Sequence, residues 1–420
     1  MILLSFLGDN KYSETNYCWQ GQSKRTTFFT AACVDFLKPG KVVLFRTEEA
    51  DRRNGDALRE ALSAYSSDLT EVTIPLGKQE EELWQIFGLL NESVPDGEEV
   101  ALDVTNGHRS VSLLGLLAAA FMRTARDIEI RHLLYGAFNI DKTNAPDVSP
   151  VFDLSPMLAL LNWSVAADRF NRSGDSHDMA ELLNDYGTEI KQQAHGNKEE
   201  LKRGSAFLKM AKSLNNVTDA LYLLRPYDVM ENTAYLEKTI RQAIPVLEDS
   251  PRSKPLEFLL SRILDTYTPL SASAEELKGH DPIPALRKEQ QMIFWYYERE
   301  LWVQTISLTR EWLISWIMVW FGEKEVLEKS RREGYEKNIS LFVWPEGKTE
   351  KTEWTDADID RLMPVKQFRK LWQDVTDSRN DIDHAGHRKN SRSSESLKQM
   401  IRNCVETIRK LSLPSSPEEH

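Results

Sequence analysis

The residues with the clearest chemical potential lie near the C-terminal end of the chain, in the segment SRNDIDHAGHRKN (residues 378–390). This segment holds Arg379, Asn380 and, five residues after the arginine, His384. Histidine exchanges protons near neutral pH, so His384 could move a proton to or from a sugar oxygen of RNA. Arg379 could stabilise the charge that develops on the phosphate, and Asn380 could hydrogen-bond the histidine or the phosphate. This set predicts metal-independent cleavage of RNA by its own 2′-hydroxyl, which leaves a 2′,3′-cyclic phosphate and a 5′-hydroxyl.

The sequence before this segment predicts a helix that carries the candidate arginine. Apolar residues recur there at helical spacing, at Phe368, Leu371, Trp372, Val375 and Ile382. Continuing this stripe places Arg379 on the apolar face, where a charge is costly unless it is paired or used. Arg379 and His384 lie about 140° apart around an ideal helix. Two copies that face each other across a dimer would therefore combine them better than a single helix does.

An ordinary explanation also fits these residues. Arg379 and Asp383 are spaced for an ion pair along one helix face. The other charges could form a solvated helix end that complements the helix dipole: His384, His387, Arg388 and Lys389. If the segment does act on RNA, the last three of these are better suited to steering RNA than to catalysis. The nearby acids are not spaced for a two-metal site, so no metal ion is expected.

Two other pairs of charged residues are weaker candidates. Arg172 and His177 repeat the five-residue spacing, but a loop-like SGDS sequence separates them and argues against a site. Arg310 and Glu311 lie among apolar residues in SLTREWLISW (residues 307–316). We expect a structural ion pair there, although one of these side chains could instead point into the RNA-cleaving site.

A second group of candidate residues follows predicted strands in the N-terminal half. The polar segments are GDNKYSETNY (residues 8–17) and DVTNGHRS (residues 103–110). Ligands of open parallel sheets bind at the carboxyl ends of the strands. In the second segment, Arg109 suits phosphate, Gly107 permits close backbone approach and Ser110 could cap the following helix. An ordinary capped turn is the alternative, and the sequence lacks the glycine-rich fingerprints of NAD- and ATP-binding loops.

These loops need an open sheet to bring them together, and the N-terminal sequence predicts one. The expected strands are 1–7, 41–45, 71–75, 98–105 and 128–136, and the expected helices are 27–37, 56–64, 79–91 and 110–122. Short apolar strands that alternate with helices predict an α/β, Rossmann-like domain with a mostly parallel, doubly wound sheet.

From about residue 156 onward the sequence is helical in pattern. The amphipathic segments are 156–172, 177–194, 198–224, 231–247, 254–267, 285–321 and 364–412. Sequences rich in Pro, Ser and Thr at 139–150 and 266–284 indicate loops between domains. We therefore expect an α/β domain over 1–152, a helical linker over 153–282 and an all-α domain over 283–420 that carries the RNA-cleaving residues.

Composition limits the classes of protein to consider. The net charge of −12 disfavours a broad surface for nucleic acid and leaves room for a local basic site. Cys18, Cys33 and Cys404 lack zinc or disulfide spacing, so a reducing cytoplasm is expected. The opening MILLSFL is expected to be a strand rather than a signal peptide. The apolar stretch WLISWIMVWF (residues 312–321) is too short to span a membrane.

Several N-terminal motifs together resemble CARF domains, the Rossmann-like sensors of CRISPR-associated effectors. They are, in chain order, GDNKYSETNY, TTFF, LDVTNGHRSVSLL and LLYGAFN. The segment DLSPMLALLNWSVAADRFNRSGD (residues 153–175) resembles the junction that follows the sensor in CARF–HEPN ribonucleases. HEPN ribonucleases carry an Arg-x4-His motif with a polar residue after the arginine, which Arg379, Asn380 and His384 match. His108 departs from the pattern, because relatives often have a more apolar or aromatic residue there.

The resemblance implies a homodimer, or a higher oligomer, that binds cyclic oligoadenylate across its twofold axis, with a ring of four adenylates favoured. Gly8, Asp9 and Asn10 would form one binding loop. The other loop would consist of Thr105, Asn106, Gly107, His108, Arg109 and Ser110. Ligand binding would activate a HEPN domain at 283–420 to cut single-stranded RNA in type III CRISPR antiviral defence. Two alternatives stay open: a non-catalytic sensor that signals to a partner, and a CARF domain that degrades its own ligand, with Asn10 and Ser110 as candidates.

Overall fold

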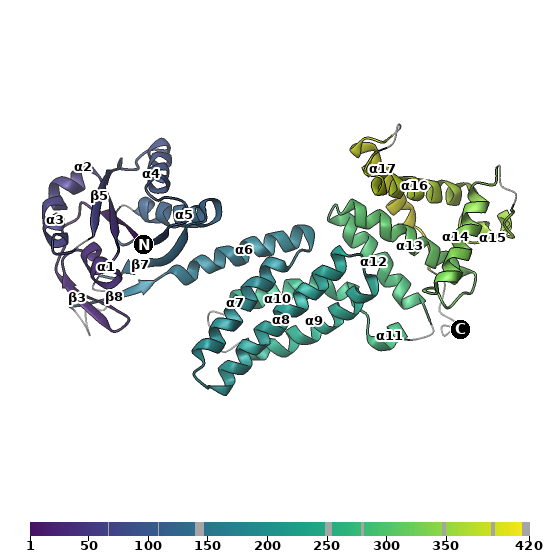
Figure 1. The fold of residues 1–420 in the computed structure, drawn as a ribbon, viewed down its shortest axis with the longest axis horizontal. Coiled ribbons are helices and arrows are strands. Elements are labelled where there is room, and N and C mark those ends of the chain that lie inside the picture. The colour runs from purple at the N-terminus through teal and green to yellow at the C-terminus, as the bar shows by residue number, and fades with distance from the viewer. Residues whose placement is uncertain are drawn as a thin grey trace. The chain divides into compact units, whose positions relative to one another are not determined.

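The structure of this chain, a computed structural model, divides into two compact units, Met1–Asn162 and Trp163–His420 (Figure 1). It describes residues 1–65, 67–107, 109–138, 147–247, 254–278, 281–346, 350–387 and 391–413. Over these residues the first unit is built around a sheet, whereas the second contains helices only. The expected fold class, an α/β domain followed by an all-helical half, is confirmed. The expected division of the helical half at residue 282 stays a prediction.

In its described residues the first unit holds an eight-stranded sheet with the order β3-β2-β8-β7-β6-β1-β4-β5. The strands are β1 (Ile2–Leu7), β2 (Thr15–Trp19), β3 (Gln22–Thr26), β4 (Lys41–Arg46), β5 (Asp68–Thr73), β6 (Glu99–Asp103), β7 (Glu129–Gly136) and β8 (Val148–Asp153). Pairing is parallel except for β2 with β3 and β7 with β8, so a mostly parallel sheet is confirmed. The strand order reverses between β1 and β6, the position where ligands of such sheets bind.

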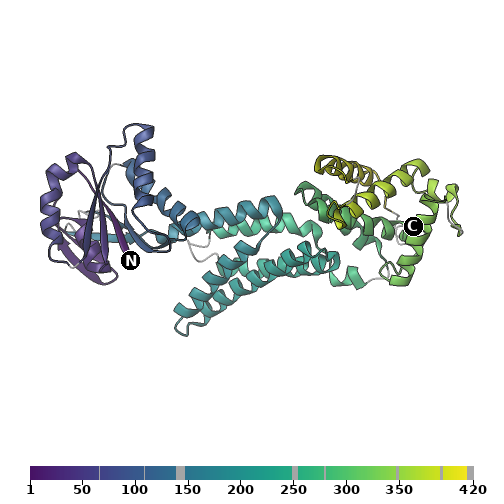
Figure 2. The same cartoon turned by 45° about the horizontal axis from the view of Figure 1, so that its top comes forward.

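Helices cover both faces of this sheet (Figure 2). They are α1 (Phe29–Leu37), α2 (Glu48–Ala50), the π-helical turn η1 (Asp51–Gly55), α3 (Asp56–Leu62), α4 (Glu80–Glu92) and α5 (Arg109–Arg126). Successive side chains of a strand point to opposite faces. In β1, Leu3 and Leu7 join the core beneath α1 and α3, whereas Leu4 and Phe6 join the core beneath α4 and α5. The continuous apolar sequence of β1 is therefore explained by burial on both faces.

Three strands of the sheet were not expected from the sequence. β2 and β3 form a hairpin whose turn residues, Gln20 and Gly21, have φ angles of 47° and 79°. β8 begins inside the expected loop 139–150 and pairs antiparallel with β7. The sequence QSKRT of β3 is polar and largely exposed, so it lacks the apolar alternation by which a strand is recognised.

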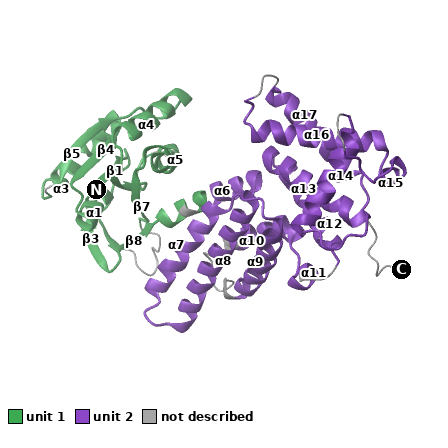
Figure 3. Ribbon diagram, turned by 45° about the vertical axis from the view of Figure 1, so that its right-hand side comes forward, with its two compact units in different colours: residues 1–162 green, residues 163–420 purple. Residues whose placement is uncertain are grey.

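The second unit is a succession of helices (Figure 3). Counting α6, which begins in the first unit, they are α6 (Ser155–Ser173), α7 (His177–Gln193), α8 (Lys198–Tyr222), α9 (Pro226–Leu247), α10 (Lys254–Tyr267), η3 (Thr268–Leu270), α11 (Ala274–Lys278), α12 (Ile283–Glu298), α13 (Trp302–Trp320), α14 (Lys329–Val343), α15 (Asp356–Asp360), α16 (Val365–Asp383) and α17 (Ser394–Arg409). The expected amphipathic segment 285–321 forms two helices: the chain breaks between α12 and α13, where Glu300 adopts a φ of 57°. α14 was not expected.

The apolar stretch at 312–321 belongs to α13 as far as Trp320, and its residues 312–318 lie in the core of the second unit. Trp312 and Trp316 are fully buried, and their indole N–H groups donate to the carbonyl oxygens of Leu286 at 2.9 Å and Ser412 at 3.0 Å. In the described part of the chain, no helix has both the length and the apolar character needed to cross a membrane.

Candidate functional site

The two polar loops of the N-terminal unit meet at the carboxyl end of the sheet. A Cβ atom on Gly8, after β1, would lie 3.4 Å from the nitrogen of Gly107, after β6. A small pocket at this place is lined by the ends of β1, β4, β5 and β6 and by the start of α5: Phe6, Leu7, Gly8, Asp9, Thr47, Ile74, Gly107 and Val111. The expected loops are therefore brought together where the strand order reverses.

Gly8 has no room for a side chain. Its N–H donates a 2.8 Å hydrogen bond to the Tyr12 hydroxyl, and a Cβ atom would lie 2.8 Å from the same oxygen. Burial raises the pKa of Tyr12 to about 12, so this hydroxyl keeps its proton at neutral pH. The first loop thus folds tightly over the end of β1.

A buried carboxylate organises the second loop. Asp103, at the end of β6, accepts hydrogen bonds from the Ser5 hydroxyl at 2.7 Å and from the Thr105 N–H at 2.8 Å. The Thr105 hydroxyl accepts a bond from the Gly136 N–H at 2.8 Å. Complete burial raises the pKa of Asp103 to about 6. Thr105 is thereby tied to β6 and β7, and Asn106 follows it half-buried.

The second loop turns sharply into α5. Gly107 has a φ of 111°, which residues with a side chain rarely adopt. α5 begins at Arg109, so Ser110 lies inside the first turn, and the expectation that Ser110 caps this helix is wrong. The Ser110 hydroxyl lies 3.7 Å from where a Cβ atom on Gly77 would be, next to the loop after β5. His108 and the Arg109 side chain fall outside the described residues.

Two residues that the sequence did not reveal hold the first loop. Asn54 Nδ2 donates to the carbonyl oxygens of Gly8 at 2.9 Å and Asn10 at 3.0 Å. Arg53 Nη1 donates to the carbonyl oxygen of Asp9 at 3.0 Å. Both residues lie in η1, shortly after β4, which is the neighbour of β1 in the sheet. The rule about strand ends applies to β4 as well and could have pointed to them.

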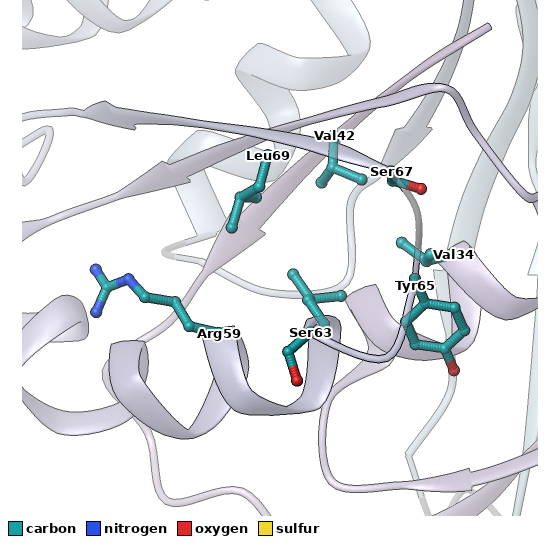
Figure 4. A pocket seen from close by; sticks show the side chains of 8 residues that line it. Val34, Val42, Arg59, Ser63, Tyr65, Ser67 and Leu69 are labelled. Atoms are coloured by element: carbon teal, nitrogen blue, oxygen red, sulfur yellow. The ribbon is translucent and has the colours of Figure 1, made fainter.

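A separate hollow of about 160 Å³ lies between α1, α3, β4 and β5 (Figure 4). Its lining residues are Val34, Val42, Arg59, Leu62, Ser63, Tyr65, Ser67 and Leu69. Arg59 is bound there by Glu71 at 2.7 Å and by Asp51 at 2.5 Å. None of the site residues expected from the sequence lines this hollow, and its charged residue is already paired.

The candidate RNA-cleaving residues lie at the C-terminal end of α16. Arg379 is half-buried, and its Nε lies 3.5 Å from Asp383 Oδ2. The ion pair of the ordinary explanation is therefore present. Asn380 is half-buried one residue further on, and His384 is exposed. The arrangement leaves the histidine open to a substrate and the arginine within reach of one.

The buried face of α16 differs from the expected one. Four apolar residues are buried as expected: Phe368, Leu371, Trp372 and Val375. Ser378 and Asp381 continue this buried stripe, whereas Arg379 lies at its edge, so the expected place of the arginine on the apolar face is wrong. Ser378 follows Val375 by three residues, so it lies on the same face of the helix. The small serine is therefore buried where the guanidinium was expected.

His384 ends the helix rather than lying within it. It is the C-cap residue, and its N–H donates to the carbonyl oxygen of Asn380 at 3.2 Å. Residues 385–386 have positive φ angles and reverse the chain. The His387 N–H then donates to the carbonyl oxygen of His384 at 2.8 Å, so both histidines occupy one tight, exposed turn. The other RNA-steering candidates lie outside the described residues: Arg388 and Lys389.

Arg310 and Glu311 belong to a network that joins α13 to α14. Arg310 Nη1 lies 2.7 Å from Glu311 Oε1, and Arg310 also pairs with Glu336. Arg332 of α14 reaches Glu311 Oε2 at 2.8 Å and the Ser315 hydroxyl at 2.7 Å. The expected structural ion pair is present.

Arg172 and His177 have separate partners. Arg172 pairs with Asp168 of its own helix at 2.9 Å. His177 opens α7 and lies between Asp175 at 2.7 Å and Asp219 at 3.1 Å. The repeated spacing is therefore not a second copy of the candidate site.

The described residues contain neither a cluster of possible metal ligands nor a disulfide. No three His, Cys, Asp or Glu side chains there are grouped to hold a metal ion. Cys18, Cys33 and Cys404 are free thiols.

Comparisons with known proteins identify the sheet-containing unit. Residues 2–139 match a family model described as the CARF domain of the CRISPR system endoribonuclease Csx1. Residues 159–271 match one described as the second domain of the CRISPR-associated protein MJ1674. The N-terminal unit is therefore a CARF domain of the Csx1 type, which confirms the resemblance seen in its motifs.

A curated relative matches over a shorter segment. CRISPR-associated protein MJ1674 of Methanocaldococcus jannaschii is 31% identical over 121 residues. These residues are 28% of this chain but only 19% of the relative, so the match spans about a fifth of that protein. The two family models cover 2–139 and 159–271, and the assignment of 283–420 as a HEPN domain depends on the geometry of α16.

Proposed function

We propose that this chain is a metal-independent endoribonuclease of type III CRISPR antiviral defence, activated by cyclic oligoadenylate and carrying a HEPN site at the end of α16. One observation carries the sensing half: the glycines of the loops after β1 and β6 touch at the reversal of strand order in a CARF domain. There a ligand can approach backbone N–H groups and the N-terminus of α5, both of which favour phosphate.

The chemistry of the pocket divides the ligand contacts by type. Gly8 and Gly107 offer backbone rather than side chains, which suits close approach of a phosphodiester. Asp9 lines the same pocket, and its carboxylate only accepts hydrogen bonds. The Asp9 carboxylate would therefore bind a ribose hydroxyl or the amino group of an adenine. Both contacts together fit a ring of adenylates.

An exposed apolar stripe on α5 supports a homodimer. Leu113, Leu117 and Phe121 are spaced along one face of the helix, with 62%, 54% and 47% of each residue exposed. The opposite face is buried against the sheet through residues such as Ala118 and Met122. A helix that is apolar on all sides is normally covered on all sides. A second copy would cover this stripe and repeat the ligand contacts across a twofold axis.

The end of α16 can supply the cleavage chemistry. His384 is exposed in a turn and would transfer the proton of the attacking 2′-hydroxyl or of the leaving oxygen. Arg379 would leave Asp383 to bind the phosphate, which costs little because exposed ion pairs contribute about 1 kcal/mol or less. A second copy would place another histidine and arginine nearby. Arg379 and His384 point in different directions around one helix, but groups from two helices could act on the same phosphate.

An RNA-cleavage assay tests the proposal. Wild type, His384→Ala and His387→Ala would be mixed with single-stranded RNA and cyclic tetra- or hexa-adenylate, with and without EDTA. We expect ligand-dependent cleavage in EDTA and a loss of about 10²-fold or more in His384→Ala. His387→Ala, from the same turn, is the matched control and should lose less than about tenfold, because a steering residue acts mainly through charge.

Three results would contradict this scheme. A strict metal requirement for cleavage would exclude the proposed chemistry. If His384→Ala binds the ligand and cuts RNA as wild type does, the site is elsewhere. If the wild type binds the ligand and cuts no RNA, the chain is a sensor for a partner.

A further inference from the structure

Two side chains of η1 capture three consecutive carbonyl groups in the loop after β1. Asn54 binds the carbonyl oxygens of Gly8 and Asn10, and Arg53 binds that of Asp9 between them, all at 2.9 or 3.0 Å. Asn54 thereby donates both hydrogens of its side-chain amide to the loop. All three carbonyl groups must consequently point toward η1.

This orientation fixes where the N–H groups of the loop point. A trans peptide directs its N–H opposite to its C=O, and none of the described residues, this loop included, has a cis peptide bond. The N–H groups of Asp9, Asn10 and Lys11 therefore point away from η1. Within the described part of the chain these three groups donate no hydrogen bond, whereas the N–H of Gly8 is taken by Tyr12. The loop presents a row of free donors on one side.

The linings of two hollows indicate which way these donors face. Gly8 and Asp9 line the pocket that they share with Gly107. Asn54 is absent from that lining and instead lines a separate hollow of about 470 Å³, together with Lys11. Because the donors of Asp9 and Asn10 turn away from Asn54, we take them to face the pocket shared with Gly107. Successive backbone N–H groups pointing into one concavity bind anions.

We propose that Asn54 and Arg53 are positioning residues that lock the loop so that the N–H groups of Asp9, Asn10 and Lys11 bind phosphate oxygens of the cyclic ligand. This inference rests on the proposed function and adds the device that preorganises its sensing site. Neither side chain needs to touch the ligand. Without these hydrogen bonds the free loop is more mobile and must lose conformational freedom when the ligand binds, which lowers the affinity for the ligand. RNA cleavage at α16 should be unchanged once the ligand is saturating.

The test uses full-length Asn54→Leu together with a matched pair of arginine variants. Arg53→Ala and Arg52→Ala each remove one exposed positive charge from η1, but among the described residues Arg52 donates to the carbonyl oxygen of Glu48 at 3.3 Å and not to the loop, whereas Arg53 also pairs with Glu49 at 3.1 Å. Binding of cyclic tetra- and hexa-adenylate would be measured by calorimetry, and RNA cleavage at saturating ligand. Trypsin cleavage after Lys11 without ligand would report directly on loop order.

We expect about tenfold weaker ligand binding in Asn54→Leu, which loses two hydrogen bonds, and about threefold in Arg53→Ala. Arg52→Ala should stay within about twofold of wild type. Maximal RNA cleavage should be unchanged in each variant, and trypsin should cut after Lys11 faster in Asn54→Leu.

Three outcomes would overturn the inference, and they separate it from the proposed function. Unchanged trypsin cleavage in Asn54→Leu would show that the loop is not locked by this residue. If the wild type binds the ligand and Asn54→Leu binds it equally tightly, Asn54 is not a positioning residue, and the proposed function is unaffected. If trypsin cuts Asn54→Leu faster but the wild type does not bind cyclic oligoadenylate, Asn54 does order the loop. The proposed ligand, and the proposed function with it, would then be wrong.

Discussion

Arg379 is the residue at which a structural and a catalytic role give different measurements. Its ion pair with Asp383 has 37% and 46% of the two side chains exposed, so the pair contributes at most about 1 kcal/mol. We expect Arg379→Ala to change the free energy of unfolding by less than that. Activated RNA cleavage should fall by about 10²-fold or more, because the phosphate loses a charged donor. Denaturant unfolding and the cleavage assay give the two values.

Asp383→Ala is the matched control for this variant, since it breaks the same ion pair and leaves the arginine in place. It should keep most of the cleavage activity. Equal losses in the two variants would assign Arg379 a structural role, as the ordinary explanation holds.

Asp103 should make the stability of the CARF domain depend on pH. Burial raises its pKa from 3.8 to about 6, so the folded state holds this proton more tightly than the unfolded state does. The resulting stabilisation is complete below pH 3.8 and is lost as the pH rises through 6. A pKa raised from 3.8 to about 6 corresponds to roughly 3 kcal/mol.

Asp103→Asn removes this titration. The variant should therefore gain stability relative to wild type, by up to that amount, as the pH rises from 3.8 to 6, and the difference should be constant at higher pH. Urea unfolding of both proteins over a pH series measures it. A difference that does not vary with pH would contradict the argument.

At the level of secondary structure, the sequence predicted elements whose apolar residues show a clear period. β1, β4, β6 and α5 are examples, because burial on one or both faces leaves a pattern in the chain. The break between α12 and α13 falls in the charged sequence ERE (residues 298–300), which a helix also tolerates, and no Pro or Gly stands at 299–301 to mark it. Glu300 adopts a φ of 57° there, which its residue type does not predict.

The candidate site shows the same limit. Gly8 and Gly107 could be predicted because each follows an apolar strand. The strand-end rule could point to Asn54, which follows β4, but its role in holding the loop after β1 depends on the pairing of β4 beside β1, a long-range contact. The position of Arg379 at the edge of the buried stripe depends on a one-residue difference in helix phase, which Ser378 decides.

The start of α7 should lose stability at higher pH. Partial burial opposes the charge of His177, but hydrogen bonds to Asp175 at 2.7 Å and Asp219 at 3.1 Å outweigh it and raise the pKa of His177. This stabilisation is complete below the unfolded pKa of 6.5 and is lost as the pH rises through the higher folded value. It amounts to less than about 1 kcal/mol, because 42% of the side chain is exposed.

His177→Gln should flatten this part of the pH dependence. Thermal unfolding above pH 6.5 would compare it with His195→Gln, which changes an exposed histidine of the same unit. Arg169, Asp178 and Tyr222 also surround the start of α7 and stay in place in both variants. If His195→Gln flattens the dependence as much as His177→Gln does, His177 does not carry the effect.

For the whole molecule, the proposed homodimer would tie ligand binding to assembly through the apolar stripe of α5. Leu117 lies in the middle of the stripe, between Leu113 and Phe121, so a lysine there would place a charge inside a twofold contact and meet its own copy. We expect Leu117→Lys to be monomeric by analytical ultracentrifugation. Its folding stability should change by no more than about 0.5 kcal/mol, because the side chain is exposed in the single chain.

The affinity of Leu117→Lys for cyclic oligoadenylate should fall because the dimer is lost. A twofold-symmetric ring that contacts one copy loses half of its partners. RNA cleavage should fall as well, because the two α16 ends are no longer held near each other. Leu223→Lys is the control: Leu223 is 69% exposed at the end of α8 and lies in the other unit. A Leu117→Lys protein that stays dimeric, or a monomer that binds the ligand as tightly as wild type, would show that the ligand does not bridge two copies at this stripe.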